Sequence, residues 1–362
     1  MKGSQSAKSR SVVLCRKQAK QYGVGIIGAG WVSGEYVKAF RDHPLTEVIG
    51  IYNKTPGKAT RLMKAHGVEG KEYASIDEFF KDERIKIVVH CAHADTRAEY
   101  VIRAAQTGRH VVIEKPMART PEEVAKMRQA ISKAKVKSVT SVVLRWNPQF
   151  ETVRQLIKEG VLGDLLYGEA DYWHPIIKAY PGYPYYMTKL SGGSSFTVAG
   201  VHAADTLRHL ALPVAGEVVE VCGFSAGPLM NKDYEYQPLS VAILKWANGA
   251  VGKLSSLIEG ETPYVFNCQL FGTEGSIRNN EVHSSKHYPG ALGYWAFPTV
   301  KPDSGEVSHH PFVPEIRHFM ECIENNVESH ASVHDTCKTM ALCFAIDESA
   351  AKGGQPVKVK LD

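Results

Sequence analysis

Three small residues near the start of the chain have the spacing of a phosphate-binding turn, namely Gly28, Gly30 and Ser33. Gly28 allows a tight turn, and Gly30 lacks a Cβ, so a pyrophosphate can approach the backbone. A small residue at position 33 lets the following helix pack closely, and the N-terminal N–H groups of that helix attract phosphate. The pattern predicts a dinucleotide site, with a purely structural glycine turn as the alternative.

Further candidate cofactor residues follow apolar runs that are typical of buried strands. Asn53 ends the second run, and its amide can hydrogen-bond ribose hydroxyls without repelling a 2′-phosphate. Lys54 can attract that phosphate, so we expect either NAD or NADP as the cofactor. The predicted cofactor site comprises Gly28, Gly30, Trp31, Val32, Asn53, Lys54, Ala92, His93, Glu114 and Lys115.

Two residues have side chains suited to proton and oxygen chemistry. Lys115 follows a strand-like run and precedes Pro116, so it is expected in a crevice where burial lowers its pKa. A solvated surface lysine is the alternative. His202 titrates near neutrality and can pass a hydroxyl proton as hydride leaves. The alternative for His202 is a core histidine satisfied by Asp205, which we interpret as an orienting partner rather than a catalyst.

The elements that must position these residues alternate between strand and helix up to residue 144. Apolar runs predict the strands, and two capping boxes that begin at Ser75 and Thr120 predict helix starts. The alternation indicates a parallel, doubly wound Rossmann sheet, whose ligands bind beyond the carboxyl ends of the strands. Expected strands are 24–27, 48–52, 85–89, 110–113 and 136–144, and expected helices are 59–66, 76–81, 96–106 and 121–134, after a first helix that ends near residue 41.

The pattern changes after residue 144 to one in which strands follow each other through short turns. Asn248-Gly249 is a two-residue hairpin signal, and short turns predict an open, mainly antiparallel sheet in a second α/β domain. Expected strands are 165–173, 218–224, 239–246, 250–258 and 264–272, expected helices are 149–158, 196–210, 313–325 and 333–351, and 281–312 is expected to be loop. The predicted domains are a disordered leader at 1–20, a dinucleotide-binding domain at 21–144 and a substrate-binding and oligomerisation domain at 145–362.

Composition narrows the class of protein. The 362 residues suit about two domains, and a net charge of +5, much of it in the leader, does not indicate a nucleic-acid partner. Seven scattered cysteines without a CxxC pair favour a reducing compartment and argue against a zinc ribbon. No run is long enough to span a membrane, and the leader lacks a signal-peptide core. We therefore expect a cytoplasmic protein without nucleic-acid or membrane partners.

Four segments together resemble the Gfo/Idh/MocA family of NAD(P)-dependent oxidoreductases, which act mostly on sugars and cyclitols. These segments are GIIGAGWVSGEY at 25–36, VVIEKPMA at 111–118, RWNPQFETVRQLIKEGVLGDLLYGEADYW at 145–173 and GGSSFTVAGVHAAD at 192–205. The resemblance implies that Lys115, in EKP, binds and polarises the substrate oxygen beside the nicotinamide. It also implies that His202, in GxHxxD, is a candidate general acid or base.

The expected substrate site lies between these two residues and an aromatic stretch at 172–189. Aromatic faces stack on sugar CH surfaces, although a rigid interface or dimer loop is an equal alternative for this stretch. His309-His310 is interpreted as a loop that reaches the pocket, because adjacent histidines rarely converge on one metal ion, and no metal site is predicted. The predicted substrate residues are Lys115, Arg145, Trp173, Tyr186, His202 and Asp205.

Two positions depart from the family pattern. Many members have an aspartate four residues before the histidine, where this chain has Val198, so the usual Asp–His relay is not available. His93 stands where the family usually has proline, and we leave open whether it has a role.

These features predict an oxidoreductase that transfers a hydride between a carbohydrate or polyol alcohol and a nicotinamide cofactor. One alternative is a redox-neutral hydrolase or lyase that oxidises a sugar transiently with bound NAD and cleaves a glycoside. Another is a non-catalytic dinucleotide-binding scaffold, against which the presence of Lys115 and His202 counts. By analogy with the family we expect a homo-oligomer, either a dimer or a tetramer.

Overall fold

The computed structural model describes residues 21–302 and 309–361, so the leader predicted at 1–20 lies outside the described residues. The first described sheet has six parallel strands in the order β3-β2-β1-β4-β5-β6. This is the predicted doubly wound Rossmann sheet, whose strand order reverses beside β1. The strands are β1 (Tyr22–Ile27), β2 (Thr46–Tyr52), β3 (Lys71–Tyr73), β4 (Ile85–His90), β5 (His110–Ile113) and β6 (Ser138–Thr140).

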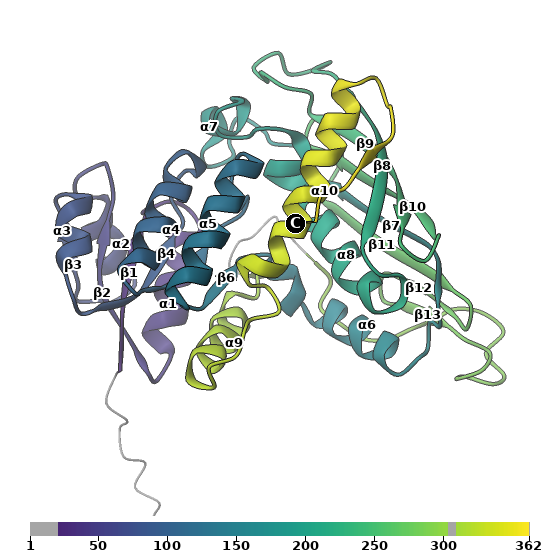
Figure 1. The fold of residues 1–362 in the computed structure, drawn as a ribbon, viewed down its shortest axis with the longest axis horizontal. Coiled ribbons are helices and arrows are strands. Elements are labelled where there is room, and N and C mark those ends of the chain that lie inside the picture. Colours follow the sequence, from purple (N-terminus) through teal and green to yellow (C-terminus); the bar gives the residue numbers. More distant parts are fainter. Residues whose placement is uncertain (1–20, 303–308, 362) are drawn as a thin grey trace, which may run out of the picture.

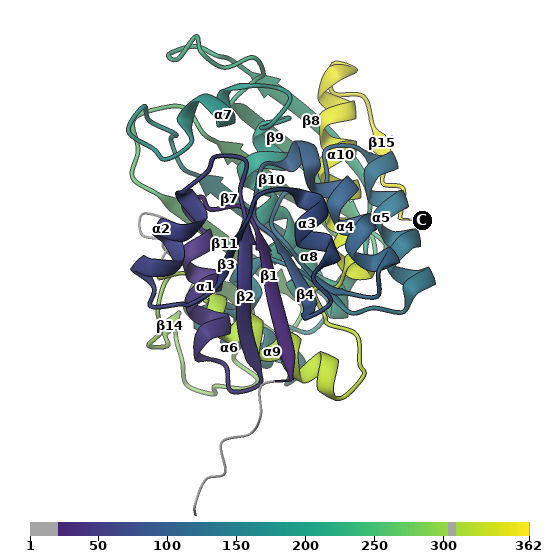
Figure 2. The same ribbon diagram turned by 90° about the vertical axis from the view of Figure 1, so that its left-hand side faces the viewer.

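Helices cover both faces of this sheet, with α1 and α2 on one side and α3, α4 and α5 on the other (Figure 2). The two predicted capping boxes are confirmed, because the hydroxyls of Ser75 and Thr120 accept hydrogen bonds from the backbone N–H groups of Glu78 and Glu123. The helices are α1 (Ser33–Asp42), α2 (Lys58–Ala65), α3 (Ile76–Lys81), the short 3₁₀ turn η1 (Ala94–Thr96), α4 (Arg97–Gln106) and α5 (Pro121–Ala134).

The second sheet has nine strands within the described residues, in the order β14-β13-β12-β11-β7-β10-β9-β8-β15. All pairs are antiparallel except β7 with β10, and the predicted hairpin at Asn248-Gly249 joins β9 to β10. The strands are β7 (Leu165–Trp173), β8 (Val218–Ala226), β9 (Leu239–Trp246), β10 (Val251–Leu257), β11 (Val265–Gly272), β12 (Ser276–Arg278), β13 (Glu281–His283), β14 (Trp295–Ala296) and β15 (Val357–Lys358).

Helices pack on one face of this second sheet and leave the other face open, as seen at the right of Figure 1. Helix α8 lies against β7 and β11, and α10 lies against β8. A single turn of π-helix, η3, leads directly into α8. These elements are the 3₁₀ turn η2 (Val143–Trp146), α6 (Pro148–Lys158), α7 (Tyr183–Met187), η3 (Phe196–Gly200), α8 (Val201–Ala215) and α10 (Val333–Ala351).

One helix from the C-terminal part of the chain packs on the first sheet. Helix α9 (Phe312–Glu324) lies beside α1, and its apolar side chains join the core on that side of the sheet. Tyr36 of α1 meets Phe312 edge to face, with ring centroids 4.9 Å apart. The division at residue 144 therefore does not describe which sheet α9 covers.

Three sequence expectations about elements were wrong in part. The strand predicted at 136–144 ends at Thr140, and the apolar residues after it form the 3₁₀ turn η2. An apolar run signals burial but does not distinguish a strand from another buried segment. The expected loop at 281–312 contains β13 and β14, which are too short to show alternation. The helix expected at 196–210 begins as a π turn and continues to Ala215.

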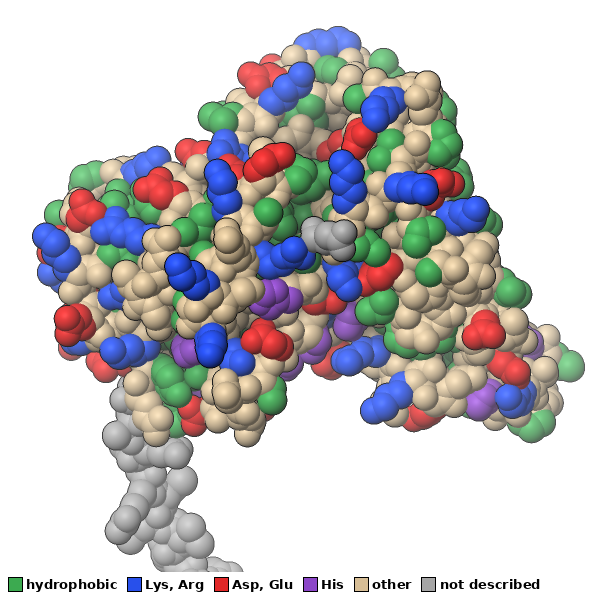
Figure 3. Space-filling model, in the orientation of Figure 1, with side chains coloured by type: hydrophobic (Ala, Val, Ile, Leu, Met, Phe, Trp, Pro, Cys, Tyr) green, Lys and Arg blue, Asp and Glu red, His purple; other side chains and the backbone are tan. Residues whose placement is uncertain are grey.

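Two further features concern the charge on the surface and the length of the helices. Basic and acidic side chains are interspersed over the face in Figure 3 rather than gathered into one basic patch. Among the described residues, no helix is both long enough and apolar enough to cross a membrane.

Candidate active site

A cavity of about 760 Å³ runs from the glycine turn to the start of α8. Its wall comes from both halves of the chain, because it includes the carboxyl ends of β1, β2, β4 and β5 together with the segment before α9. Most of the residues predicted from the sequence line it. These are Gly28, Gly30, Trp31, Val32, Asn53, Lys54, Ala92, His93, Glu114, Lys115, Tyr186 and His202.

The glycine turn has the geometry that its spacing predicts. Gly28 has φ +114°, and a Cβ at this position would lie 2.7 Å from the backbone nitrogen of Ala92. A Cβ at Gly30 would meet no atom within 4 Å, so open space lies over this backbone. The hydroxyl of Ser33 accepts a hydrogen bond from the Gly30 N–H at 2.9 Å and thereby fixes the turn. The turn therefore leaves room for a phosphate group at the start of α1.

Asn53 connects the glycine turn to the loop after β2. Its Oδ1 accepts a hydrogen bond from the Ala29 N–H at 3.1 Å, and its Nδ2 donates to the Thr55 carbonyl at 3.0 Å. Lys54 and Lys58 line the same end of the cavity. This end therefore combines an amide that is already hydrogen-bonded with two cationic side chains.

Lys115 follows β5 and lies between the two halves of the chain. Its Nζ donates a hydrogen bond to the Val198 carbonyl in the π turn at 3.1 Å. Such a turn departs from the regular α-helical pairing, and π turns often occur at functional sites. Burial lowers the pKa of the Lys115 ammonium, while the nearby Glu114 carboxylate acts in the opposite direction. The backbone of the π turn thus supplies a hydrogen-bond partner for the Lys115 ammonium.

His202 lies one turn further along this helix and is buried. Its ring stacks on Tyr172, with centroids 5.6 Å apart. Burial holds the pKa of His202 well below its usual range, and the charges of Lys115 and His310 lower it further. Its Nδ1 has no hydrogen-bond partner among the described residues. The imidazole is therefore neutral near pH 7 and retains the capacity to accept a proton.

The aromatic stretch before η3 closes the cavity over the cofactor loops. The ring of Tyr180 meets Trp31 of the glycine turn edge to face at 5.1 Å, and the hydroxyl of Tyr185 accepts a hydrogen bond from the Ala94 N–H at 2.6 Å. Tyr185 also contacts His93, with ring centroids 3.8 Å apart. This stretch is therefore a wall of the cavity that contacts the dinucleotide-binding half directly.

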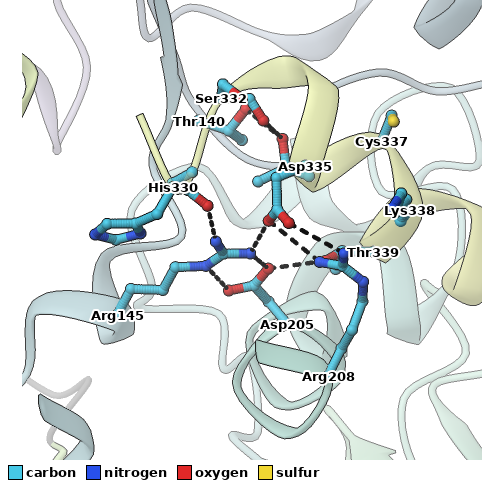
Figure 4. A network of polar contacts seen from close by, with 12 residues as sticks. Thr140, Arg145, Asp205, Arg208, His330, Ser332, Asp335, Cys337, Lys338 and Thr339 are labelled. Atoms are coloured by element: carbon cyan, nitrogen blue, oxygen red, sulfur yellow. Dashed lines mark hydrogen bonds and ion pairs between the residues drawn. The ribbon is translucent and has the colours of Figure 1, made fainter. Parts of the chain in front are cut away.

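Three predicted substrate residues lie outside the cavity wall. Arg145 donates a bidentate pair of hydrogen bonds to the Asp205 carboxylate, at 2.6 and 2.7 Å, and another to Asp335 at 2.6 Å (Figure 4). Trp173 lies at the end of β7, where its indole N–H donates to Ser255 at 2.9 Å. Arg145 and Asp205 thus bind each other in a buried network and Trp173 lies elsewhere on the sheet, so a substrate-binding role for these three residues stays a prediction.

The network around Arg145 joins η2, α8 and α10. Asp335 also accepts from Arg208 at 3.1 and 3.2 Å, and Arg208 pairs with Glu217 at 2.8 Å. The two guanidinium groups hold the pKa of the Asp335 carboxyl well below its usual range, although burial acts against them. The network thus fixes the helix that carries His202 without contacting the cavity.

Sequence reasoning missed one residue that shapes the site. Arg97 is buried beside the cavity and donates hydrogen bonds to the Ala92 carbonyl at 2.8 Å and to the Pro116 carbonyl. It thereby joins the loops that carry His93 and Lys115. Its signal in the sequence is only a charged residue in a helix, which is usually solvent-exposed. Of the pair at 309–310, interpreted from the sequence as a loop that reaches the pocket, His310 lines the cavity.

The cysteine and metal-ligand chemistry of the described residues is limited. All six described cysteines are free thiols. No group of three or more His, Cys, Asp or Glu side chains in the described part of the chain is arranged to hold a metal ion.

Two family models match the chain. The GFO_IDH_MocA model, described as an oxidoreductase family with an NAD-binding Rossmann fold, matches residues 22–142. The model of the GFO/IDH/MocA C-terminal domain matches residues 150–278. The two matches follow the two halves of the chain and together span most of it.

Similar proteins include two named dehydrogenases. The chain is 26% identical over 336 residues to inositol 2-dehydrogenase of Rhizobium meliloti (strain 1021), covering 91% of this chain and 97% of that protein. It is 24% identical over 387 residues to levoglucosan dehydrogenase of Pseudarthrobacter phenanthrenivorans (strain DSM 18606 / JCM 16027 / LMG 23796 / Sphe3), covering 91% and 96%. A solved levoglucosan dehydrogenase in complex with NADH and levoglucosan has a TM-score of 0.83 at 23% identity and covers 94% of this chain and 99% of that chain, which shows a shared fold.

Proposed function

Because the chain belongs to the Gfo/Idh/MocA oxidoreductase family, we propose that it transfers a hydride between an alcohol of a carbohydrate or polyol and NAD or NADP. The observation that carries this proposal is a single cavity that contains the glycine turn, Lys115 and His202. The similarity to inositol and levoglucosan dehydrogenases supports the class of substrate.

The dinucleotide site fits the residues that the chain presents. The open space above Gly30 and the start of α1 suit the pyrophosphate, and Asn53 with Lys54 suits the adenosine ribose. His93 and Lys115 then lie toward the nicotinamide end of the cavity. When bound, the nicotinamide ring supplies the acceptor or donor of the hydride.

The proposed roles of Lys115 and His202 follow from their charges. Lys115 hydrogen-bonds the reacting oxygen and stabilises the negative charge that develops there as the alcohol loses its proton. His202 is neutral, so a ring nitrogen accepts that proton in the oxidation and returns it in the reduction. Tyr180 and Tyr186 offer ring faces to the CH surface of a sugar or cyclitol and exclude water.

A coenzyme assay over a broad panel tests this proposal. The panel contains free sugars, sugar acids, cyclitols and glycosides, and we expect net reduction of added NAD⁺ or NADP⁺ by at least one of them. If coenzyme is never turned over, yet a glycoside is cleaved and solvent deuterium enters beside the oxidised carbon, the redox-neutral alternative is correct. Val198 in place of the aspartate gives that alternative its basis, since the proton chemistry around His202 then differs from the common pattern.

We also propose that the chain forms a homo-oligomer through the open face of the second sheet. Exposed apolar side chains gather there on neighbouring strands, namely Phe224, Val241, Ile243 and Val251. In an isologous contact the same face of a second copy would cover this one, which suits a sheet face on which no helix of the described residues packs. The six cysteines of the described residues are free, which supports a reducing compartment, and a cytoplasmic location is part of this proposal.

A further inference from the structure

A path of four polar side chains runs from the backbone of Lys115 to α9. Glu114 accepts a hydrogen bond from the Lys115 N–H at 2.8 Å, and its other oxygen lies 3.0 Å from the hydroxyl of Tyr36. That hydroxyl lies 2.5 Å from the Ser141 Oγ, which lies 2.7 Å from the Glu315 Oε1. Every step is within hydrogen-bond distance, so the four side chains form one continuous path.

The path is buried and comes from four separate elements. Glu114 follows β5, Tyr36 lies on α1, Ser141 follows β6 and Glu315 lies on α9. Glu315 is fully buried, and its Oε2 has no hydrogen-bond partner among the described residues. An unpaired carboxylate in such a place is strongly disfavoured, so burial raises the pKa of Glu315 to about 8. Glu315 therefore carries a proton near pH 7.

The hydrogen count gives the path two arrangements. Tyr36 has one hydroxyl proton and two acceptors in reach, Ser141 and Glu114. When Glu315 is protonated it donates to Ser141, Ser141 donates to Tyr36, and Tyr36 donates to Glu114. If that proton instead moves along the path to Glu114, these three donors reverse and Glu315 is ionised.

We propose that Glu114 and Glu315 share one proton through the hydroxyls of Tyr36 and Ser141, and that its position sets the negative charge beside Lys115. In the transfer from Glu315 to Glu114, three O–H bonds break and three form, and the total charge of the path stays at −1. With the proton on Glu315, Glu114 is anionic and favours the charged ammonium of Lys115. With the proton on Glu114, that support is lost, and the ammonium of Lys115 releases its proton more readily.

Other titratable groups act on this path from the elements packed around it. Burial raises the pKa of the Tyr36 hydroxyl, and Glu114, Glu315 and Cys91, which follows β4, raise it further. Beyond the effect of burial, Glu114 raises the pKa of the Lys115 ammonium, whereas Arg97 of α4 lowers it. Lys115 and His310, the latter just before α9, add to burial in lowering the pKa of the His202 imidazole. The role of the path in catalysis rests on the proposed dehydrogenase function, whereas the sharing of the proton does not.

Infrared titration of the purified protein tests the sharing without any substrate. We expect the band of a protonated carboxyl to disappear with a midpoint near pH 8 and to lose this component in Glu315→Gln. The raised pKa of Asp347, about 7, gives a second band, so each variant is compared with the wild type. Tyr36→Phe should shift the midpoint, because it removes the hydroxyl that connects the Glu114 carboxyl to Ser141 and Glu315. A component near pH 8 that survives in Glu315→Gln overturns the proposal.

The pH dependence of hydride transfer tests the link to Lys115. We expect both Glu315→Gln and Tyr36→Phe to lose an inflection near pH 8 that the wild type shows. Tyr73→Phe is the matched control, because Tyr73 is also a buried tyrosine bonded to a carboxylate, Asp82, but lies away from the cavity. If Glu315→Gln loses the inflection and Tyr36→Phe retains it, the path through Tyr36 is wrong. If the wild type oxidises no substrate, the proposed function fails while the infrared result still decides the sharing.

Discussion

Lys115 combines a lowered pKa with a fixed position, and both depend on neighbours far away in the sequence. The Val198 carbonyl fixes its Nζ, and burial makes its proton easier to release. Replacement with alanine removes the group that stabilises charge on the reacting oxygen. We therefore expect Lys115→Ala to lower kcat by roughly 10²–10³ while NAD(P)H affinity changes little.

Steady-state kinetics and a fluorescence titration with NAD(P)H check this prediction. Lys126→Ala on α5 is the control for loss of a lysine, because Lys126 lies outside the cavity. Unchanged turnover in Lys115→Ala would remove Lys115 from the mechanism.

Val198 offers a test of how His202 takes part. In the wild type, His202 is neutral because burial keeps its pKa well below the usual range, so protonation stops the reaction only at low pH. A carboxylate at position 198 favours the charged imidazolium and raises that pKa. We expect Val198→Asp to move the acidic limb of the kcat/KM profile to higher pH, whereas the neutral Val198→Asn leaves it in place. Equal shifts in both variants would show that the charge is not the cause.

The choice between NAD and NADP depends on a few side chains at the end of β2. Asn53 does not repel a 2′-phosphate, and Lys54 lies beside it, so we expect the two affinities to differ by less than about tenfold, or roughly 1.4 kcal/mol. Asn53→Asp should favour NAD by placing a carboxylate against the phosphate. Isothermal titration with both cofactors measures this. A wild-type preference of about a thousandfold would show that other residues decide.

At the scale of elements, much of the arrangement follows from local sequence. The glycine spacing, two capping boxes and five apolar runs were enough to predict the Rossmann sheet, because each is a short-range signal. The strand β3 was missed, since three residues are too few to show a period. The placement of α9 on the first sheet was also missed, because nothing local in Phe312–Glu324 identifies the sheet that it covers.

The candidate site shows the same division between local and long-range information. Lys115 and His202 could be predicted, since each lies in a short motif, and the structure brings both to one cavity. Their catalytic roles stay predictions. Arg145 and Asp205 lie in equally recognisable motifs, yet they bind each other, and pairing between distant residues leaves no trace in one sequence.

The Arg145 network gives a stability prediction at this scale. Asp205→Asn removes the charge that faces Arg145 at a fully buried position. Breaking such a pair leaves an uncompensated charge, so we expect a loss of about 3–5 kcal/mol in the free energy of unfolding. Chemical denaturation measures it. The exposed pair of Arg278 and Glu281 is the control, and Glu281→Gln should cost less than about 1 kcal/mol. Equal costs would refute a structural role for the network.

At the scale of the whole molecule, the two sheets are covered differently. The first has helices on both faces, whereas the second has helices on one face and presents the other to solvent. Polar contacts lie within the open face as well, where Lys253 pairs with Asp171 at 3.1 Å and with Glu169 at 3.6 Å. An apolar surface that surrounds satisfied ion pairs suits a specific contact between copies better than a disordered aggregate.

This asymmetry predicts that one exposed residue on β9 controls the assembly. Ile243 is 55% exposed and pairs across the strands with Lys253 and Cys222. In an isologous dimer each Ile243→Asp substitution is present twice, so two carboxylates are desolvated in one interface. We expect the wild type to sediment as a dimer or larger and Ile243→Asp as a monomer, with the glycine turn and the cavity intact. Val327→Asp is the control, because Val327 is 51% exposed but follows α9, away from this sheet. If both variants keep the wild-type mass, or if the wild type is itself a monomer at micromolar concentration, the open face is not the interface between copies.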